Sequence, residues 1–158
     1  RYRRHFSGAV CCHLWSKVEL MNYSKPIPEI TLLTEPFWEG LRSKELRMQA
    51  CSQCSVLRFI PKEVCPDCSS VDYVWQQVSG LGMVYSYTTI HGGVGPAFRD
   101  DLPFVTVIVE LDEGPRVMSH LINCLPDAVE IGMRVSVVFE DATEELTLYK
   151  FEPHDAGR

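Results

Sequence analysis

The chain has 158 residues, of which 46% are hydrophobic and 23% are charged, and its net charge at pH 7 is −6. This length holds one good core or two small ones and excludes a large multidomain enzyme, while the composition excludes a disordered protein. The charge is uneven, because residues 1–70 contain 10 Lys/Arg against 7 Asp/Glu and residues 71–158 contain 5 against 14. Nucleic-acid phosphates are bound through Lys and Arg, so the acidic second half argues against a general nucleic-acid-binding role.

Residues 1–29 are predicted to form an N-terminal extension that is disordered in part. An apolar run at residues 9–15 follows a basic start, but His13 interrupts it and no small-x-small cleavage site follows, which argues against a secretory signal. We expect Met21 to be the true start and residues 1–20 to be an upstream extension. No stretch approaches the ~20 apolar residues that span a bilayer, so we predict a soluble protein without a membrane partner.

A short helix opens the first predicted domain, residues 30–78. Thr34 suits the N-cap position and Pro36 suits the first turn, where its missing N–H has no intrahelical partner to lose. Gly40 and Ser43 are expected to keep the helix short. The helix is expected to dock on a neighbouring element through one apolar side. This side consists of Phe37, Trp38 and Leu41.

The rest of this domain has only short strand-like pieces around two pairs of cysteines. The pieces are Leu46–Gln49, Leu57–Ile60 and Tyr73–Val78. They bury too little apolar surface to fold alone, and a bound metal can supply the missing stability. This part of the chain is therefore predicted to depend on a metal ion.

Four of the seven cysteines form two Cys-x-x-Cys pairs separated by ten residues, namely Cys51, Cys54, Cys65 and Cys68. Each pair can lie on a tight turn that points two thiolates at one ion, and four thiolates leave no coordination position for water or substrate. We predict a structural zinc ion, with iron in a rubredoxin-like site as the alternative. Buried free cysteines and a redox dithiol are the other interpretations, but the usual βαβ context of a redox dithiol is absent. The odd cysteine count argues against a disulfide framework and favours a reducing, cytoplasmic setting.

Residues 79–158 are predicted to form an all-β domain, because short strands alternate with turn residues. We expect a partly open five-stranded Greek-key barrel of the OB type. The predicted strands are Met83–His91, Phe104–Leu111, Arg116–Asn123, Arg134–Glu140 and Leu146–Phe151. The second strand is apolar with little alternation over Val105–Val109, which indicates a central position.

Two connections in this domain are unusual. Gly92–Phe98 belongs to a long glycine-rich loop, and long loops in compact domains are usually functional or disordered. A binding role and a plain mobile connection are both compatible with its sequence. Residues 123–132 are predicted to hold a turn and a short helical piece.

A set of motifs in fixed order resembles one known family over about residues 30–153. The motifs are Glu35–Leu41, the four cysteines, Gly82–Thr88, Pro103-Phe104, Val109–Gly114 and Ile131–Met133. They resemble the acyl-CoA-associated proteins that join a rubredoxin-like zinc ribbon to an OB-fold. The resemblance implies a mainly β protein with a short N-terminal helix, the ribbon and the barrel in that order. It also implies zinc ligation by Cys51, Cys54, Cys65 and Cys68.

What the resemblance implies about function is an accessory role. Family members typically accompany thiolases, thiolase-like aldolases or hotdog-fold enoyl-CoA hydratases in lipid, polyketide or steroid side-chain metabolism. We therefore expect an acyl-CoA-binding accessory subunit that lacks a catalytic site of its own. The alternative is a single-stranded nucleic-acid-binding protein, because zinc ribbons and OB barrels also serve that role. An autonomous CoA-thioester enzyme is a third possibility, but no activated nucleophile or open metal supports it.

Basic residues around the ribbon are candidates for binding the phosphates of coenzyme A. They are Arg42, Lys44, Arg47, Arg58 and Lys62. A solvated face, or a patch that binds an acidic partner protein, is the simpler explanation of the same residues, because no phosphate-binding loop is visible in the sequence. Histidine side chains can act as general bases near neutral pH, but neither His91 nor His120 lies at a recognisable catalytic spacing. Cys124 is interpreted as a small buried hydrophobic residue.

Overall fold

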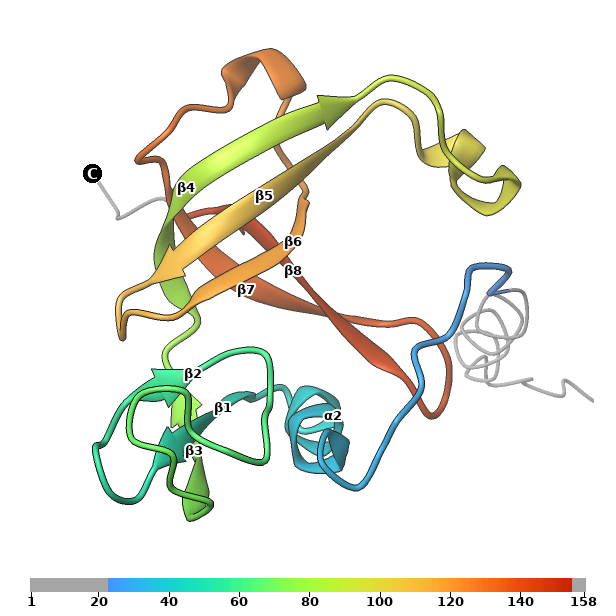
Figure 1. The fold of residues 1–158 in the computed structure, drawn as a ribbon. Helices are drawn as coiled ribbons and strands as arrows, with labels where there is room; N and C mark the ends of the chain where they lie inside the picture. The colour runs from blue at the N-terminus through green and yellow to red at the C-terminus, as the bar shows by residue number, and fades with distance from the viewer. Residues whose placement is uncertain (1–22, 155–158) are drawn as a thin grey trace, which may run out of the picture.

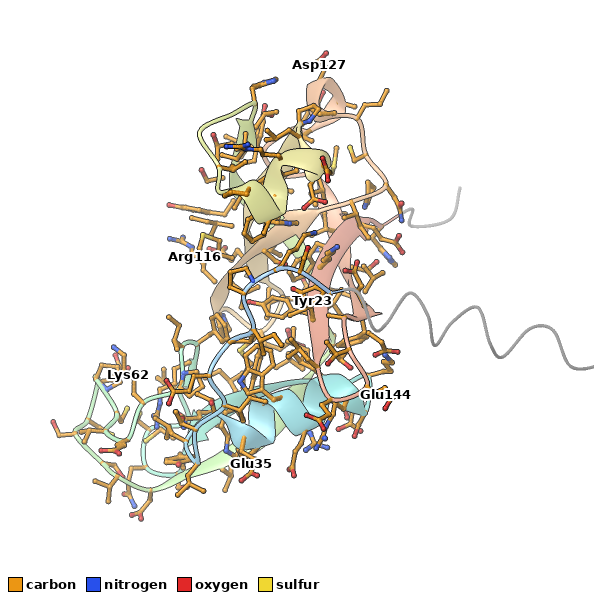
Figure 2. All side chains as sticks on the ribbon, turned by 90° about the vertical axis from the view of Figure 1, so that its right-hand side faces the viewer. Tyr23, Glu35, Lys62, Arg116, Asp127 and Glu144 are labelled. Atoms are coloured by element: carbon orange, nitrogen blue, oxygen red, sulfur yellow. The ribbon has the colours of Figure 1, made fainter. Side chains whose placement is uncertain are left out.

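The computed structural model describes residues 23–154, which fold into two units that share one core. The first unit contains helix α2 (Glu35–Arg42) and a three-stranded sheet, and the second is a five-stranded barrel. Figure 1 shows the helix and the small sheet side by side beneath the barrel. The N-terminal segment runs from α2 past one side of the barrel, where Tyr23 lies in Figure 2.

Helix α2 starts where the sequence predicts and ends for a different reason. Thr34 is the N-cap, but its hydroxyl accepts a hydrogen bond from Thr31 N–H at 3.0 Å and does not cap the helix. At the other end Lys44 has φ of 59°, and Glu45 N–H donates to the Gly40 carbonyl at 2.8 Å. This left-handed residue after the C-cap closes the helix in a Schellman motif.

The helix is short, as expected, and Ser43 is its C-cap, but Gly40 does not end it. Gly40 lies inside α2 and is buried. A Cβ at this position would lie 2.8 Å from Cδ of Arg47, so the missing side chain makes room for that arginine. The small residue therefore serves packing between the helix and the neighbouring strand.

The small sheet has the strand order β2-β1-β3. Its strands are β1 (Leu46–Cys51), β2 (Leu57–Arg58) and β3 (Tyr73–Val78), all antiparallel. Strand β2 is shorter than the predicted Leu57–Ile60. Pro61 accounts for the loss of Ile60 from the strand, because proline has no N–H for a ladder and restricts the residue before it.

The barrel is closed, in the order β4-β5-β6-β8-β7. Its strands are β4 (Leu81–Ile90), β5 (Phe104–Leu111), β6 (Arg116–Leu121), β7 (Arg134–Asp141) and β8 (Thr147–Pro153). Strands β4 and β7 pair antiparallel and close the barrel at one seam, whereas β6 and β8 pair parallel through Leu121 and Phe151 alone at the other. The barrel predicted to be partly open is thus complete, although one seam is narrow.

Strand β5 pairs with β4 on one side and β6 on the other, as its predicted central position requires, and it has one buried face. Its inward side chains are Val105, Val107, Val109 and Leu111, and all four are buried, while the residues between them are half exposed. The outward residues include Phe104 and Ile108. The sequence of the strand is therefore apolar on both faces, although only one face lines the core.

The barrel core continues into the helix and the small sheet. Phe37, Leu41, Leu46 and Met48 belong to the same buried cluster as the inward residues of the barrel. The ring of Phe37 lies 5.8 Å from that of Tyr149 on β8. Both predicted connections contain helical turns, η1 (Pro96–Asp101) and η2 (Pro126–Ala128). None of the helices between residues 23 and 154 has the length and apolarity that crossing a membrane requires.

Candidate metal centre

Two backbone turns of the same design carry the four cysteines. In the first, Ser55 N–H donates to the Cys51 carbonyl at 2.9 Å, and Ser55 is left-handed with φ of 60°. In the second, Ser69 N–H donates to the Cys65 carbonyl at 2.9 Å, and Ser69 also has φ of 60°. Each Cys-x-x-Cys-Ser segment thus folds locally into a tight turn that points both of its sulfurs to one side.

The two turns face each other, so the four sulfurs converge. All four Sγ atoms lie within 4.8 Å of one another. Cys51 Sγ lies 3.5 Å from Cys68 Sγ, and Cys54 Sγ lies 3.7 Å from Cys65 Sγ. A tetrahedron with Zn–S bonds of ~2.3 Å has S–S edges of about 3.8 Å. The donor set and its spacing therefore fit a four-coordinate zinc ion, and such a site leaves no open position for water.

The backbone of each turn also favours the thiolate form. The N–H groups of Cys54 and Gln53 lower the pKa of Cys51 to about 6. The N–H groups of Cys68 and Asp67 likewise lower the pKa of Cys65. Because a zinc ligand must be deprotonated, these N–H groups prepare the first cysteine of each pair for the metal.

A buried polar pair supports the loop between the two turns. The Oε1 atom of Gln49, a residue with 0% exposure, accepts hydrogen bonds from Arg58 Nε and from Lys62 N–H, both at 2.9 Å. Arg58 Nη2 donates to the Lys62 carbonyl at 3.2 Å, and the guanidinium lies 5.5 Å from the ring centre of Tyr73. Sequence reasoning did not single out Gln49. The only signal that could have identified it is an amide side chain within a strand whose other residues are mostly buried.

The structure does not gather the five predicted basic residues into one cluster. Arg58 is buried and bonded within the ribbon, and Arg47 pairs with Glu45 at 2.6 Å. Arg42 and Lys44 line a shallow hollow together with Glu144, and Lys44 pairs with Asp141. Lys62 is exposed at the ribbon tip, and Figure 2 shows it on the opposite side of the molecule from Glu144, which lies in the loop between β7 and β8.

The remaining candidate residues also have plain structural positions. Phe37 is buried in the core, and Trp38 packs half-buried against it. His91 is exposed just beyond the end of β4. His120 lies on β6 with its ring 4.7 Å from that of Phe104. Cys124 packs against the core as a small apolar residue but is half-buried and not fully buried, and its sulfur lies 3.5 Å from the Leu125 carbonyl.

Fold and site together define a class of protein: a four-cysteine zinc ribbon fused to a closed OB-type barrel. Two family profiles divide the chain in the same way. Residues 38–73 match the ChsH2 rubredoxin-like zinc ribbon domain, and residues 75–140 match the ChsH2 C-terminal OB-fold domain. The chain belongs to this family, whose members also carry the name DUF35.

Three relatives are similar over most of this chain. A probable enoyl-CoA hydratase alpha subunit of Thermomonospora curvata is 38% identical over 82% of this chain, which spans 40% of that protein. A DUF35 domain-containing scaffold protein of Methanocaldococcus jannaschii is 36% identical over 65% of this chain and 77% of the relative. A solved structure, the Ltp2-ChsH2(DUF35) aldolase, superposes with a TM-score of 0.74 at 38% identity, covering 80% of this chain and 98% of that one.

Proposed function

We propose that this chain is an accessory subunit that binds a partner enzyme acting on acyl-CoA thioesters. The zinc ribbon would present a fixed surface to the partner, and the barrel would complete the environment of the thioester. The partner is a thiolase-like enzyme or a hotdog-fold enoyl-CoA hydratase of lipid, polyketide or steroid side-chain metabolism.

The observation that carries this proposal is the closed sulfur donor set. Because four thiolates saturate a zinc ion, the metal cannot activate water, and its role is to hold the two turns together. Among residues 23–154, neither candidate histidine has a described hydrogen bond to a nucleophile or a carboxylate. A chain built this way supports another protein's chemistry more readily than its own.

The names of the relatives support the same conclusion. One is a hydratase alpha subunit, another is a scaffold protein, and the third is part of an aldolase named with two components. This chain spans only 40% of the hydratase subunit, so the shared part is the ribbon and barrel rather than that whole protein. The shared part is what we propose to be the accessory module.

Acyl-CoA binding belongs to this proposal as well. Of the five basic residues, Arg42, Lys44 and Lys62 are exposed and remain candidates for contacts with the phosphates or with the partner, although Lys44 would first have to leave Asp141. Arg47 and Arg58 are poor candidates, because their guanidinium groups already bond to Glu45 and Gln49.

Affinity purification of the tagged full chain from its native cells tests the proposal. We expect a thiolase-like or hydratase-like protein to co-purify in a fixed ratio, and acyl-CoA turnover to require both proteins. Cys65→Ser should abolish the association because it dismantles the ribbon, whereas Cys124→Ser, a cysteine away from the metal centre, should preserve it. Acyl-CoA turnover by the isolated chain, or recovery of nucleic acid in place of a protein, would refute the accessory role.

A further inference from the structure

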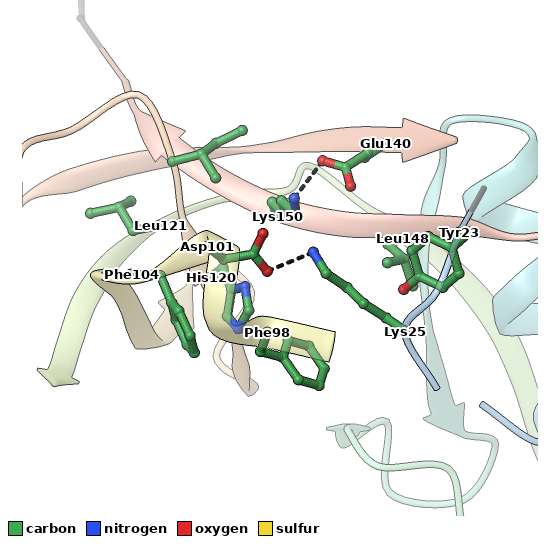
Figure 3. A pocket seen from close by; sticks show the side chains of 11 residues that line it. Tyr23, Lys25, Phe98, Asp101, Phe104, His120, Leu121, Glu140, Leu148 and Lys150 are labelled. Carbon is green, nitrogen blue, oxygen red and sulfur yellow. Dashed lines mark hydrogen bonds and ion pairs between the residues drawn. The ribbon is translucent and has the colours of Figure 1, made fainter. Parts of the chain in front are cut away.

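A trench crosses the outside of the barrel between β6 and β8. One hollow of about 290 Å³ reaches toward Phe98 and Phe104, and a second of about 260 Å³ reaches toward Trp38 and Met118. The two hollows share His120, Leu148 and Lys150, so they form one elongated depression, which we call the trench. Figure 3 shows its first half, with His120 between Phe104 and Phe98 and the chain of Lys25 running alongside.

The trench exists because the two strands beneath it are joined at few points. Strands β6 and β8 pair only through Leu121 and Phe151. Nearby, side chains bridge the seam: Ser119 Oγ donates to the Tyr149 carbonyl at 2.7 Å, and Tyr149 Oη donates to the Met118 carbonyl at 3.0 Å. These bridges hold the seam in place, so the depression is a built feature of the barrel.

The charges in the trench cancel one another. Lys25 pairs with Asp101 at 2.6 Å, and Lys150 pairs with Glu140, as Figure 3 shows. Burial lowers the pKa of His120, and the nearby Lys150 and Lys25 lower it further, so the imidazole is neutral at pH 7. A phosphate group entering the trench would have to separate these ion pairs and would face both carboxylates. The trench is therefore suited to an uncharged ligand.

The walls combine apolar surface with a few groups that suit amides. Phe98, Phe104 and Leu148 provide aromatic and aliphatic contacts. A neutral imidazole offers one donor and one acceptor, which match the N–H and C=O of an amide, and Thr106, which carries a hydroxyl, lines the same trench. An elongated, uncharged chain that carries amide groups and an apolar end fits these walls.

A peptide strand from a partner is uncharged as well, but it lacks an edge on which to dock. Peptides add to sheets through free strand edges, and at this seam the edges are taken up by the Leu121–Phe151 pair and by the side-chain bonds of Ser119 and Tyr149. On their other sides β6 pairs along its length with β5, and β8 pairs along its length with β7. A small ligand is therefore the better occupant.

We propose that the trench binds the pantetheine arm and acyl group of a CoA thioester, with the nucleotide phosphates outside it. This inference rests on the proposed function and specifies which part of the thioester the barrel takes. The amides of the arm meet His120 and Thr106, and the acyl chain lies on the apolar wall. The thioester is positioned here, and its chemistry belongs to the partner.

The test is a titration of the full chain followed by NMR, with S-acetylpantetheine and adenosine 3′,5′-bisphosphate as separate probes. We expect S-acetylpantetheine to shift the resonances of His120 and Leu148, and the bisphosphate to leave them unchanged. Leu148→Trp, which fills both hollows, should weaken S-acetylpantetheine binding by about tenfold or more. Ile131→Trp, an equal enlargement at an exposed position outside the trench, should bind like the wild type.

A second variant covers the case in which Leu148→Trp fails to fold. His120→Phe keeps a ring against Phe104 but removes the amide partner, and it should weaken binding in the same direction. Unchanged binding in both variants, no shift at the trench in millimolar S-acetylpantetheine, or displacement of S-acetylpantetheine by the bisphosphate would overturn the inference. Co-purification of the partner does not depend on the trench, so retained association without pantetheine binding removes this inference alone.

Discussion

The two turns of the zinc ribbon are stabilised by different interactions from those that stabilise the barrel, although both belong to one chain. Residues 51–72 hold their shape through four sulfurs, two left-handed serines and one buried polar pair, with exposed aliphatic side chains around them. The barrel holds its shape through inward valines that are almost fully buried. The comparison teaches that a metal can replace a core where too few residues are available to build one.

Removal of zinc should have the largest effect and should separate the two regions. Structural zinc contributes ~10–16 kcal/mol in small zinc-finger peptides, so chelation or Cys65→Ser should unfold residues 51–72. Amide hydrogen exchange should show protection lost in this segment and kept in β4–β8, where burial supplies the stability. Cys124→Ser provides the control, because that sulfur lies outside the metal centre. Loss of protection in the barrel as well would break the comparison.

Truncation of the barrel core should give the next largest effect. Phe151 is fully buried, and Phe151→Ala should lower the free energy of unfolding by about 3–5 kcal/mol through the cavity it leaves. Urea denaturation measures this loss. Val74→Ala, at an exposed position on β3, should change it by less than about 0.5 kcal/mol. An equally stable Phe151→Ala protein would mean that the barrel does not rely on its core.

The junction between the two units offers a smaller and sharper test. Gly80 has φ of +72°, and a Cβ there would lie 2.2 Å from Cγ1 of Val137. Gly80→Ala should therefore cost about 3 kcal/mol from left-handed strain and overpacking together. Gly93→Ala has a similar φ of +76° with nothing nearby, so thermal unfolding of that variant should report the strain alone, about 1–2 kcal/mol. Equal losses in the two variants would show that Val137 moves aside.

The smallest expected effect is a pH dependence of the free energy of unfolding, which arises from one histidine of the barrel. Burial, with Lys150 and Lys25 nearby, lowers the folded-state pKa of His120, whereas Asp101 and Glu140 oppose this shift. The unfolded chain therefore binds more protons as the pH falls through ~6.5, and stability is lost in that window. Urea denaturation should show that the free energy of unfolding falls between pH 8 and pH 6, and that it falls less in His120→Gln than in the wild type. A larger loss in the variant would reverse the assigned direction.

The sequence predicted the features that are local or repeated. The spacing of the cysteines predicted the metal centre, and the strands Tyr73–Val78 and Phe104–Leu111 have the predicted bounds. Thr34 was placed correctly as the N-cap residue. These features depend on neighbours in the chain, which is why single-sequence patterns reveal them.

The sequence missed features that depend on contacts between distant residues. The role of Gly40 depends on Arg47 folding back over it, and the role of Gln49 depends on Arg58 and Lys62 arriving from the next loop. The trench needs Lys25, His120 and Lys150, which are far apart in the chain. The five basic residues are close in sequence, but the fold spreads them over different faces, and no spacing rule predicts that.

The ring of Phe37 lies between the two units, 5.6 Å from Phe59 of the ribbon and 5.8 Å from Tyr149 of the barrel. Tyr149 is also a wall of the trench. Three interlocked rings leave little freedom for one unit to swivel on the other. A partner protein that binds the ribbon would thereby also fix the orientation of the barrel, without touching the barrel itself.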